Sequence, residues 1–146
     1  MRKILFVCTG NTCRSPMAEI IMKNKIKNAG ITDVRVSSAG LSAVAGSKMS
    51  ENSFKALKAL GYKPYGFKSR VLTKKLMLSA DAIICMTEGH RQYLTAYPNV
   101  TTMNEMTGLG DILDPYGGDL TLYKLTSIQI EEACEIILKK ILINNK

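Results

Sequence analysis

Residues 3–16 read KILFVCTGNTCRSP and carry the clearest structural signal in the chain. Residues 3–7 are a short run of apolar, β-forming side chains, which is typical of a buried strand. Ser15 and Pro16 predict the start of a helix, as an N-cap and a proline in the first helical position. The helix is expected to run to about Asn28. A strand that passes through a tight turn into a helix is the first unit of an α/β protein.

The rest of the chain repeats this alternation. Further strands are predicted at residues 34–38, 82–86 and 100–103, and further helices at residues 50–60, 73–79, 87–97 and 120–143. The pattern favours an α/β fold: a single three-layer domain over residues 1–146, with a central four-stranded parallel sheet and helices on both faces. Ligands of such sheets bind at the carboxyl ends of the strands, so the turn after residue 7 is the expected site.

The composition narrows the function classes. With 146 residues, of which 46% are hydrophobic, the chain is long enough to bury a core and not polar enough to be disordered. No apolar run approaches a membrane span or a signal peptide, so a cytoplasmic protein is expected. The net charge of +8 comes from scattered residues, without an arginine-rich run, so neither nucleic acid nor a membrane is an expected partner.

The four cysteines are predicted to be thiols. They include no Cys-x-x-Cys pair, and the chain has one histidine, so no metal site and no cofactor are expected. Cys85 and Cys134 are interpreted as core residues. His90 lies in a polar helical stretch and is predicted to be solvated.

The turn between the first strand and helix has the features of an anion site. A loop that enters a helix N-terminus directs unpaired N–H groups toward one point, and Gly10 and Asn11 tolerate the left-handed backbone that this needs. Arg14 adds a planar fork for two phosphate oxygens. Cys8 faces this positive site and is expected to be a thiolate nucleophile at neutral pH. The predicted residues that bind phosphate or another oxyanion are Thr9, Gly10, Asn11, Thr12, Cys13, Arg14 and Ser15.

These residues carry a family resemblance over essentially the whole chain. The string VCTGNTCRSPMAE (residues 7–19) resembles the signature of the low-molecular-weight protein tyrosine phosphatases, and DPYGG (residues 114–118) resembles their general-acid loop. Residues 38–40, 69–73 and 81–87 also resemble family landmarks. The resemblance implies a phosphatase that acts on phosphorylated protein substrates through a phosphocysteine intermediate.

The resemblance also implies individual roles. Cys8 is the nucleophile and Arg14 clamps the phosphoryl group. Asn11 holds the loop shape with help from Ser38, while Ser15 donates a hydrogen bond to the thiolate. Asp114 is the general acid.

Physical reasoning supports Asp114 as the catalytic carboxyl. A phosphocysteine route needs a proton donor and later a base for water, and one carboxyl can serve as both. Gly110 and Gly117 flank the segment and allow it to move. Asp111 and Asp119 are alternatives, but Asp111 follows a glycine at a turn and Asp119 is placed to cap the last helix.

Departures from the family pattern bear on the substrate. Phe67 stands where many members have a histidine, so a hydrogen bond to the loop asparagine is either missing or replaced. Thr12 replaces the usual isoleucine, as in the bacterial protein-arginine phosphatases of the family. Tyr116 supplies one aromatic wall, but Gly117 follows it and residues 41–48 contain no aromatic side chain. Thr12 and Tyr116 are therefore the predicted specificity residues, with phosphoarginine favoured and phosphotyrosine as the alternative.

Other interpretations stay open. The resemblance implies that Cys8 and Cys13 can form a reversible disulfide, although simple packing of Cys13 is equally consistent with the sequence. An arsenate reductase of the same fold would need two further relay cysteines. A noncatalytic phosphocysteine carrier, such as a sugar-phosphotransferase B component, would leave Arg14 and the acid loop without a role.

Overall fold

The computed structural model describes residues 2–144. Four strands form one parallel sheet in the order β2-β1-β3-β4, which confirms the predicted sheet. Each observed end lies within two residues of the prediction. The strands are β1 (Arg2–Cys8), β2 (Val34–Gly40), β3 (Ala82–Cys85) and β4 (Val100–Thr102).

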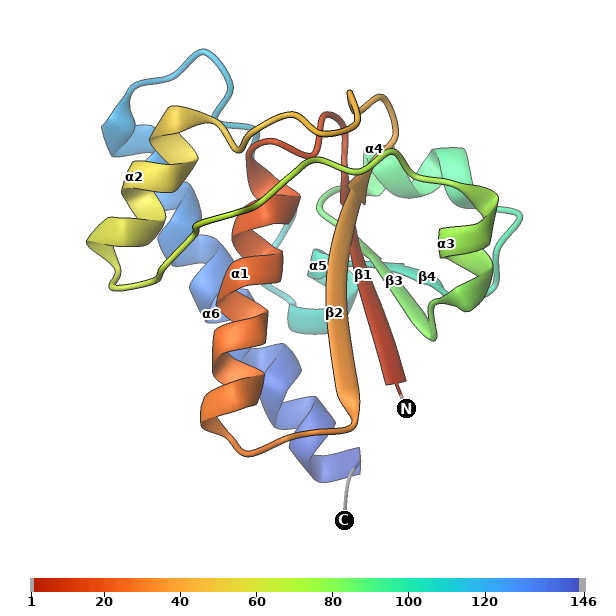
Figure 1. The fold of residues 1–146 in the computed structure, drawn as a ribbon. Coiled ribbons are helices and arrows are strands. Elements are labelled where there is room, and N and C mark those ends of the chain that lie inside the picture. The colour runs from red at the N-terminus through yellow and green to blue at the C-terminus, as the bar shows by residue number, and fades with distance from the viewer. Residues whose placement is uncertain (1, 145–146) are drawn as a thin grey trace.

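Helices cover both faces of the sheet, so the three-layer prediction is also confirmed (Figure 1). One layer contains α1 (Arg14–Asn28), α2 (Glu51–Ala59) and α6 (Leu120–Asn144). The other contains α3 (Lys74–Ser79), α4 (Glu88–Arg91) and a 3-10 turn, Gln92–Leu94. The short helix α5 (Met103–Thr107) follows β4 directly and was not predicted, because five residues are too few to show a helical period.

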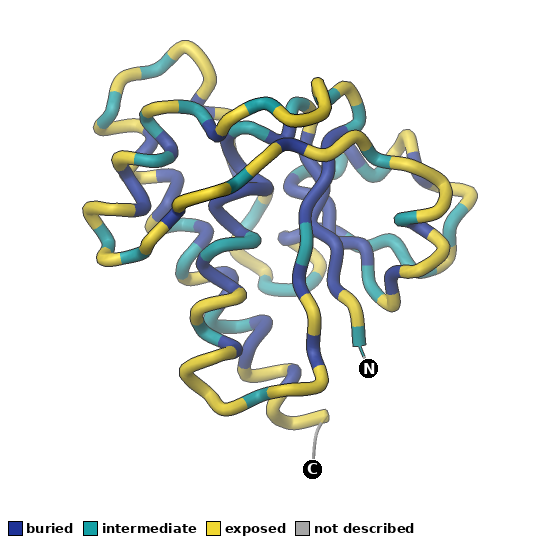
Figure 2. Tube along the Cα trace, viewed as in Figure 1, coloured by how far each residue is buried: buried dark blue, intermediate teal, exposed yellow. Residues whose placement is uncertain are grey.

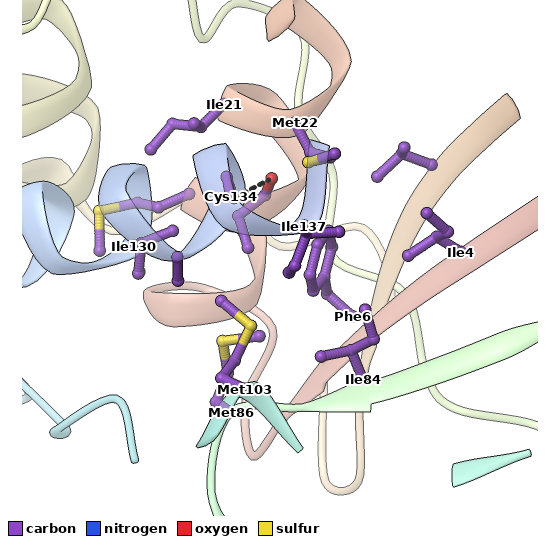
Figure 3. Packing of buried hydrophobic residues seen from close by; sticks show 14 of the residues in the cluster. Ile4, Phe6, Ile21, Met22, Ile84, Met86, Met103, Ile130, Cys134 and Ile137 are labelled. Atoms are coloured by element: carbon purple, nitrogen blue, oxygen red, sulfur yellow. Dashed lines mark hydrogen bonds between the residues drawn. The ribbon is translucent and has the colours of Figure 1, made fainter. Parts of the chain in front are cut away.

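Alternating side chains of β1 fill both halves of the core. Ile4 and Phe6 pack toward α1 and α6, and Leu5 and Val7 pack toward α3. Figure 3 shows Ile137 of α6 directed at Phe6. The strands lie mostly in the buried interior, whereas exposed residues concentrate in the loops (Figure 2). A parallel sheet buried on both faces needs continuous apolar runs, which is why residues 3–7 were a reliable signal.

The start of α1 differs from the prediction. Cys13 occupies the N-cap position without a side-chain hydrogen bond, and Arg14 is the first helical residue. Ser15 therefore does not cap the helix, and Pro16 is the third helical residue rather than the first. Proline is still tolerated there, because N–H groups of the first turn have no partner within the helix.

The predicted helix at residues 87–97 is shorter than expected. Thr87 caps it by accepting the N–H of His90, but α4 ends at Arg91 and the 3-10 turn ends at Leu94. Pro98 follows closely, and the residue before a proline disfavours helical geometry. Thr73 and Ser50 lie at the N-caps of α3 and α2, and the side chain of each accepts a backbone N–H.

Candidate active site

The loop after β1 is held by one asparagine in a left-handed conformation. Asn11 has φ of 54°, and among residues 2–144 it is the only non-glycine residue with positive φ. Asparagine is one of the few residues that adopts this geometry at low cost. Its side chain is fully buried, so its polar atoms must find partners within the protein.

Every polar group of the Asn11 side chain has such a partner. Its Nδ2 donates to Ser15 Oγ at 2.8 Å and to Ser38 Oγ at 2.9 Å, while its Oδ1 accepts the backbone N–H of Arg70 at 2.8 Å. Ser69 Oγ donates to the Asn11 carbonyl at 2.7 Å. The polar groups of Asn11 are therefore paired without a hydrogen bond from residue 67.

Gly40 lets the end of β2 approach this loop. A Cβ atom at this position would lie 2.5 Å from the Thr9 carbonyl oxygen and 2.9 Å from the Asn11 nitrogen. Both neighbours are backbone atoms, so they cannot move aside without displacing the loop. The Ser38-Ala39-Gly40 landmark therefore has a steric reason: any larger residue would distort the loop.

Cys8 and Arg14 lie at the two ends of the loop. The Cys8 thiol is 2% exposed, and its Sγ lies 2.8 Å from Ser15 Oγ. Arg14 is 5% exposed; its Nη1 donates to the Ile112 carbonyl at 3.1 Å and its Nη2 lies 3.6 Å from Asp114 Oδ2. The guanidinium is therefore fixed between the loop and the segment that carries Asp114.

A cavity of about 290 Å³ opens above these groups. It brings most of the predicted loop residues together with two residues about 100 positions further along the chain. Asn11 and Ser15 lie behind it, fully buried. The residues that line the cavity are Cys8, Thr9, Gly10, Thr12, Cys13, Arg14, Asp114 and Tyr116.

The three candidate carboxylates have different surroundings. Asp114 lines the cavity, and its Oδ1 accepts the backbone N–H of Tyr116 at 3.1 Å. Asp119 accepts the N–H of Leu122 at 3.0 Å and caps α6, as expected. Asp111 accepts the N–H of Glu88 at 3.2 Å. Of the three, Asp114 alone reaches the cavity.

His90 is buried, so the prediction of a solvated side chain is wrong. It is 6% exposed, with Nε2 2.9 Å from Thr9 Oγ1 and Nδ1 3.0 Å from Thr87 Oγ1. Burial, together with the charge of Arg14, lowers the pKa of His90 to about 4, so the ring is neutral. The polar neighbours of His90 in sequence concealed that the first turn of α4 faces the loop after β1.

The cysteines are all free thiols. Cys85 and Cys134 are core residues, as predicted, and burial raises the pKa of each to about 12. They lie in different clusters, on opposite faces of the sheet. Cys13 Sγ lies 3.5 Å from Ser50 Oγ and 3.5 Å from Tyr123 Oη, which fits the packing interpretation.

Tyr123 is a site neighbour that the sequence did not reveal. Burial and the contact with Cys13 raise its pKa to about 12, so its hydroxyl stays protonated. Its position on α6 follows from packing, and no local pattern marks it.

Within residues 2–144, no cluster of three or more His, Cys, Asp or Glu side chains is arranged to hold a metal ion. In the same residues, no helix is both long and apolar enough to cross a membrane.

Comparisons with known proteins identify relatives of this chain. Residues 3–146 match the family described as low molecular weight phosphotyrosine protein phosphatase. A protein-arginine-phosphatase of Bacillus subtilis (strain 168) is 40% identical over 147 residues, which cover 94% of this chain and 95% of that protein. The low molecular weight protein-tyrosine-phosphatase PtpB of Staphylococcus haemolyticus (strain JCSC1435) is 35% identical over 133 residues, covering 88% and 91%.

A solved structure adds a chemical observation. It is the YwlE arginine phosphatase, as a cysteine-to-serine mutant with a phosphorylated active site serine; it superposes with a TM-score of 0.89, at 38% identity, over 95% of each chain. With the matched family covering residues 3–146, the chain belongs to the low molecular weight phosphotyrosine protein phosphatase family.

Proposed function

We propose that the protein hydrolyses phosphorylated protein side chains through a phosphocysteine on Cys8, with phosphoarginine as the favoured substrate. The observation that carries this proposal is the single cavity lined by Cys8, Arg14 and Asp114. It combines a nucleophile, an anion clamp and a proton donor in one space of about 290 Å³.

The first step forms the phosphoenzyme. The Cys8 thiolate, accepting a hydrogen bond from Ser15 Oγ 2.8 Å away, attacks phosphorus, so that the S–P bond forms as the bond from phosphorus to the leaving group breaks. Asp114 gives its proton to the leaving atom. Arg14 and the loop N–H groups stabilise the charge on the phosphoryl oxygens, and no metal is needed for this. The phosphorylated active site serine of the YwlE mutant supports a covalent intermediate.

The second step regenerates the enzyme. Asp114, now a carboxylate, takes a proton from water as the water oxygen attacks phosphorus. The S–P bond breaks, phosphate leaves and the Cys8 thiolate is restored. The loop holds inorganic phosphate before this product is released, so phosphate is expected to act as a product inhibitor.

Two features of the cavity and one comparison favour phosphoarginine. Thr12 is half-buried in the lining and brings a hydroxyl, which can pair with a guanidine N–H. Asp114 Oδ2 lies 3.6 Å from Arg14 Nη2, and the Asp114 side chain is 55% exposed, so it can also pair with a substrate guanidinium. The arginine phosphatase relative from Bacillus subtilis supports the same substrate class.

Phosphotyrosine is the second candidate. Tyr116 lines the cavity and can stack on a phenyl ring, and the PtpB relative is named a tyrosine phosphatase. However, Tyr116 is 83% exposed and is the one aromatic residue in the lining. A single solvated ring gives little apolar enclosure.

The remaining alternatives find less support. A disulfide relay for arsenate reduction needs cysteines within reach of each other, but Cys85 and Cys134 are buried on opposite faces of the sheet. A phosphocysteine carrier would not need Asp114 at the cavity. Hydrolysis of p-nitrophenyl phosphate would reject the carrier. We also propose a cytoplasmic location, because a nucleophilic thiol with a neighbouring cysteine needs a reducing compartment.

Matched phosphoarginine and phosphotyrosine peptides test the substrate class. The wild type is expected to have the higher kcat/KM for phosphoarginine. Thr12→Ile is expected to shift the ratio by about tenfold toward phosphotyrosine, because a buried guanidine N–H left unpaired costs ~1–3 kcal/mol. Thr95→Ile, at an exposed position away from the cavity, is the control and should leave the ratio unchanged. A wild type that prefers phosphotyrosine, or equal losses on both substrates in Thr12→Ile, would contradict the phosphoarginine assignment.

A further inference from the structure

A second cavity, of about 640 Å³, runs along the outer edge of β2. It shares no lining residue with the cavity above Cys8. Its walls come from α1 on one side and from Arg70 and α3 on the other, with β2 as the floor. We call it the β2 groove. Nothing in the proposed reaction uses it.

The floor of the β2 groove is an unpaired strand edge. β2 is the first strand of the sheet, with β1 on its inner side only. At its end, Gly40 donates to the Arg70 carbonyl at 2.9 Å and accepts the N–H of Leu72 at 2.9 Å, which makes an isolated parallel bridge with Val71. In Figure 1 the chain between α2 and α3 crosses β2 near this end, and no described helix or strand lies across the rest of that edge.

The register of the sheet identifies the free peptide groups. Alternate residues of a strand direct their N–H and C=O groups to opposite edges. The N–H and C=O groups of Gly40 face away from β1. The peptide groups of Ser38, Val36 and Val34 therefore face away from β1 as well. The bridge at Val71 demonstrates that this edge accepts a parallel chain, and three residues of the same edge remain for another.

The groove is strongly cationic. Lys23 and Lys27 project from α1, Arg35 comes from β2, and Lys3 and Arg70 complete the rim. The single acidic residue in the lining is Glu19, and it is already engaged by Lys23 Nζ at 3.0 Å and by Ser38 Oγ at 2.8 Å. An occupant that complements this charge must be acidic.

Apolar side chains separate these cations. Ile26 lies between Lys23 and Lys27 on α1, and Ile31 and Leu76 add further apolar surface. A compact anion would leave this surface unused, whereas a peptide with acidic and apolar residues would cover it. Peptide recognition by strand addition takes affinity from main-chain hydrogen bonds and specificity from flanking side chains.

We propose that the β2 groove binds an acidic, extended segment of another protein, which adds to the outer edge of β2 as a fifth strand. The groove would then select among phosphoproteins that carry such a segment, a consequence that rests on the proposed function. Binding itself requires neither a phosphoryl group nor Cys8. The Glu19, Ser38 and Asn11 hydrogen bonds connect the groove to the loop after β1.

The test is direct binding of an unphosphorylated peptide to the full chain. The probe is a fluorescein-labelled nine-residue peptide that carries glutamate and valine on both faces of the extended chain. It is expected to bind, as measured by fluorescence anisotropy. The same peptide with lysine in place of every glutamate is not expected to bind. Lys27→Glu, which reverses an exposed charge in the groove, should weaken binding by about fivefold, on the scale of one exposed ion pair. Lys63→Glu makes the same charge change at an exposed position outside the groove and should bind as the wild type does.

N-methylated peptides separate strand addition from simple charge attraction. Methylating alternate amides on the edge that faces β2 should abolish binding, while methylating the other alternate set should not. Amide resonances of Val34 and Val36 should shift with the unmodified peptide. Absence of binding, equal binding of the lysine peptide, or indifference to both methylation patterns would overturn the proposal, and the cations would then serve to protect the edge from aggregation.

Hydrolysis of p-nitrophenyl phosphate distinguishes the two proposals. Lys27→Glu is expected to hydrolyse this small substrate at the wild-type rate. If peptide binding fails while hydrolysis persists, the groove proposal alone is wrong. If hydrolysis is absent while the peptide binds, the proposed function is wrong and the groove proposal stands.

Discussion

The loop after β1 and the segment that carries Asp114 are built in opposite ways. In the loop, Asn11 and Ser15 are fully buried, and Asn11 alone takes part in four hydrogen bonds with other elements. In the acid segment, Tyr116 is 83% exposed and the Asp114 side chain is 55% exposed. The hydrogen bonds of residues 114–118 are internal, from Tyr116 N–H to Asp114 and from Gly118 N–H to Pro115.

The difference indicates a division of labour. An anion site works best when its donors are fixed before the substrate arrives. A proton donor must reach different leaving groups and let product out, so it belongs on a segment that can move. Arg14 joins the two parts: its Nη2 lies 3.6 Å from Asp114 Oδ2, and its Nη1 donates to the carbonyl of the buried residue Ile112. The Ile112 N–H in turn donates to the Met86 carbonyl.

The largest expected effect comes from replacing Cys8, the proposed nucleophile, or Arg14, the proposed phosphate-binding residue. Cys8→Ser and Arg14→Ala should each lower turnover of an aryl phosphate by at least about 10³-fold, with the fold retained. Arg14→Lys keeps the charge but loses the fork, and it should remain far below the wild type. Steady-state kinetics with thermal unfolding of each variant provides the measurement. Turnover above a tenth of wild type would show that the roles are misassigned.

A smaller loss is expected from a substitution in the exposed segment that carries Asp114. Asp114→Asn should lower turnover by about 10²-fold for a poor leaving group and less for a good one, because only the poor one needs a proton. Its pH–rate profile should also change on the acidic limb. Asp111→Asn is the matched control, because Asp111 accepts a hydrogen bond from the Glu88 N–H and does not line the cavity. An unchanged Asp114→Asn rate with a tyrosine-like leaving group would point to Asp111 or Asp119 instead.

The smallest effect concerns His90, which supports the fixed loop from outside. Folding lowers the pKa of His90 from 6.5 to about 4. As the pH falls, the imidazole is therefore protonated in the unfolded chain at a higher pH than in the folded protein. The stabilisation from the neutral ring is complete above pH 6.5 and declines as the pH falls toward 4. His90→Gln keeps polar atoms near Thr9 and Thr87 without this titration.

Denaturant unfolding at several pH values checks this expectation. Between pH 6.5 and 4, the free energy of unfolding should fall less steeply in His90→Gln than in the wild type. Arg14, Asp111 and Asp114 also act on the ring electrostatically, so the slopes are compared at matched ionic strength. Identical slopes would mean that His90 titrates in the folded protein as it does in the unfolded chain.

Prediction from the sequence succeeded where the signal was local. The apolar strand at residues 3–7 and the helix predicted at residues 120–143 each depend on neighbours within one or two turns. The extent of α4 was wrong and α5 was missed, because short helices take their stability from packing rather than from periodicity.

Local signals also identified most of the candidate site, because a strand, a tight turn and a helix start follow one another within residues 3–16. The sequence alone was sufficient to predict the α/β alternation, a candidate anion-binding turn with Cys8 and Arg14, and the candidate carboxyl Asp114. The three-dimensional structure was needed to show that Ser69 and Arg70 hold Asn11, that His90 is buried against Thr9, and that the edge of β2 forms a cationic groove. These contacts join residues far apart in the chain, and no spacing along the sequence encodes a distance across a folded core.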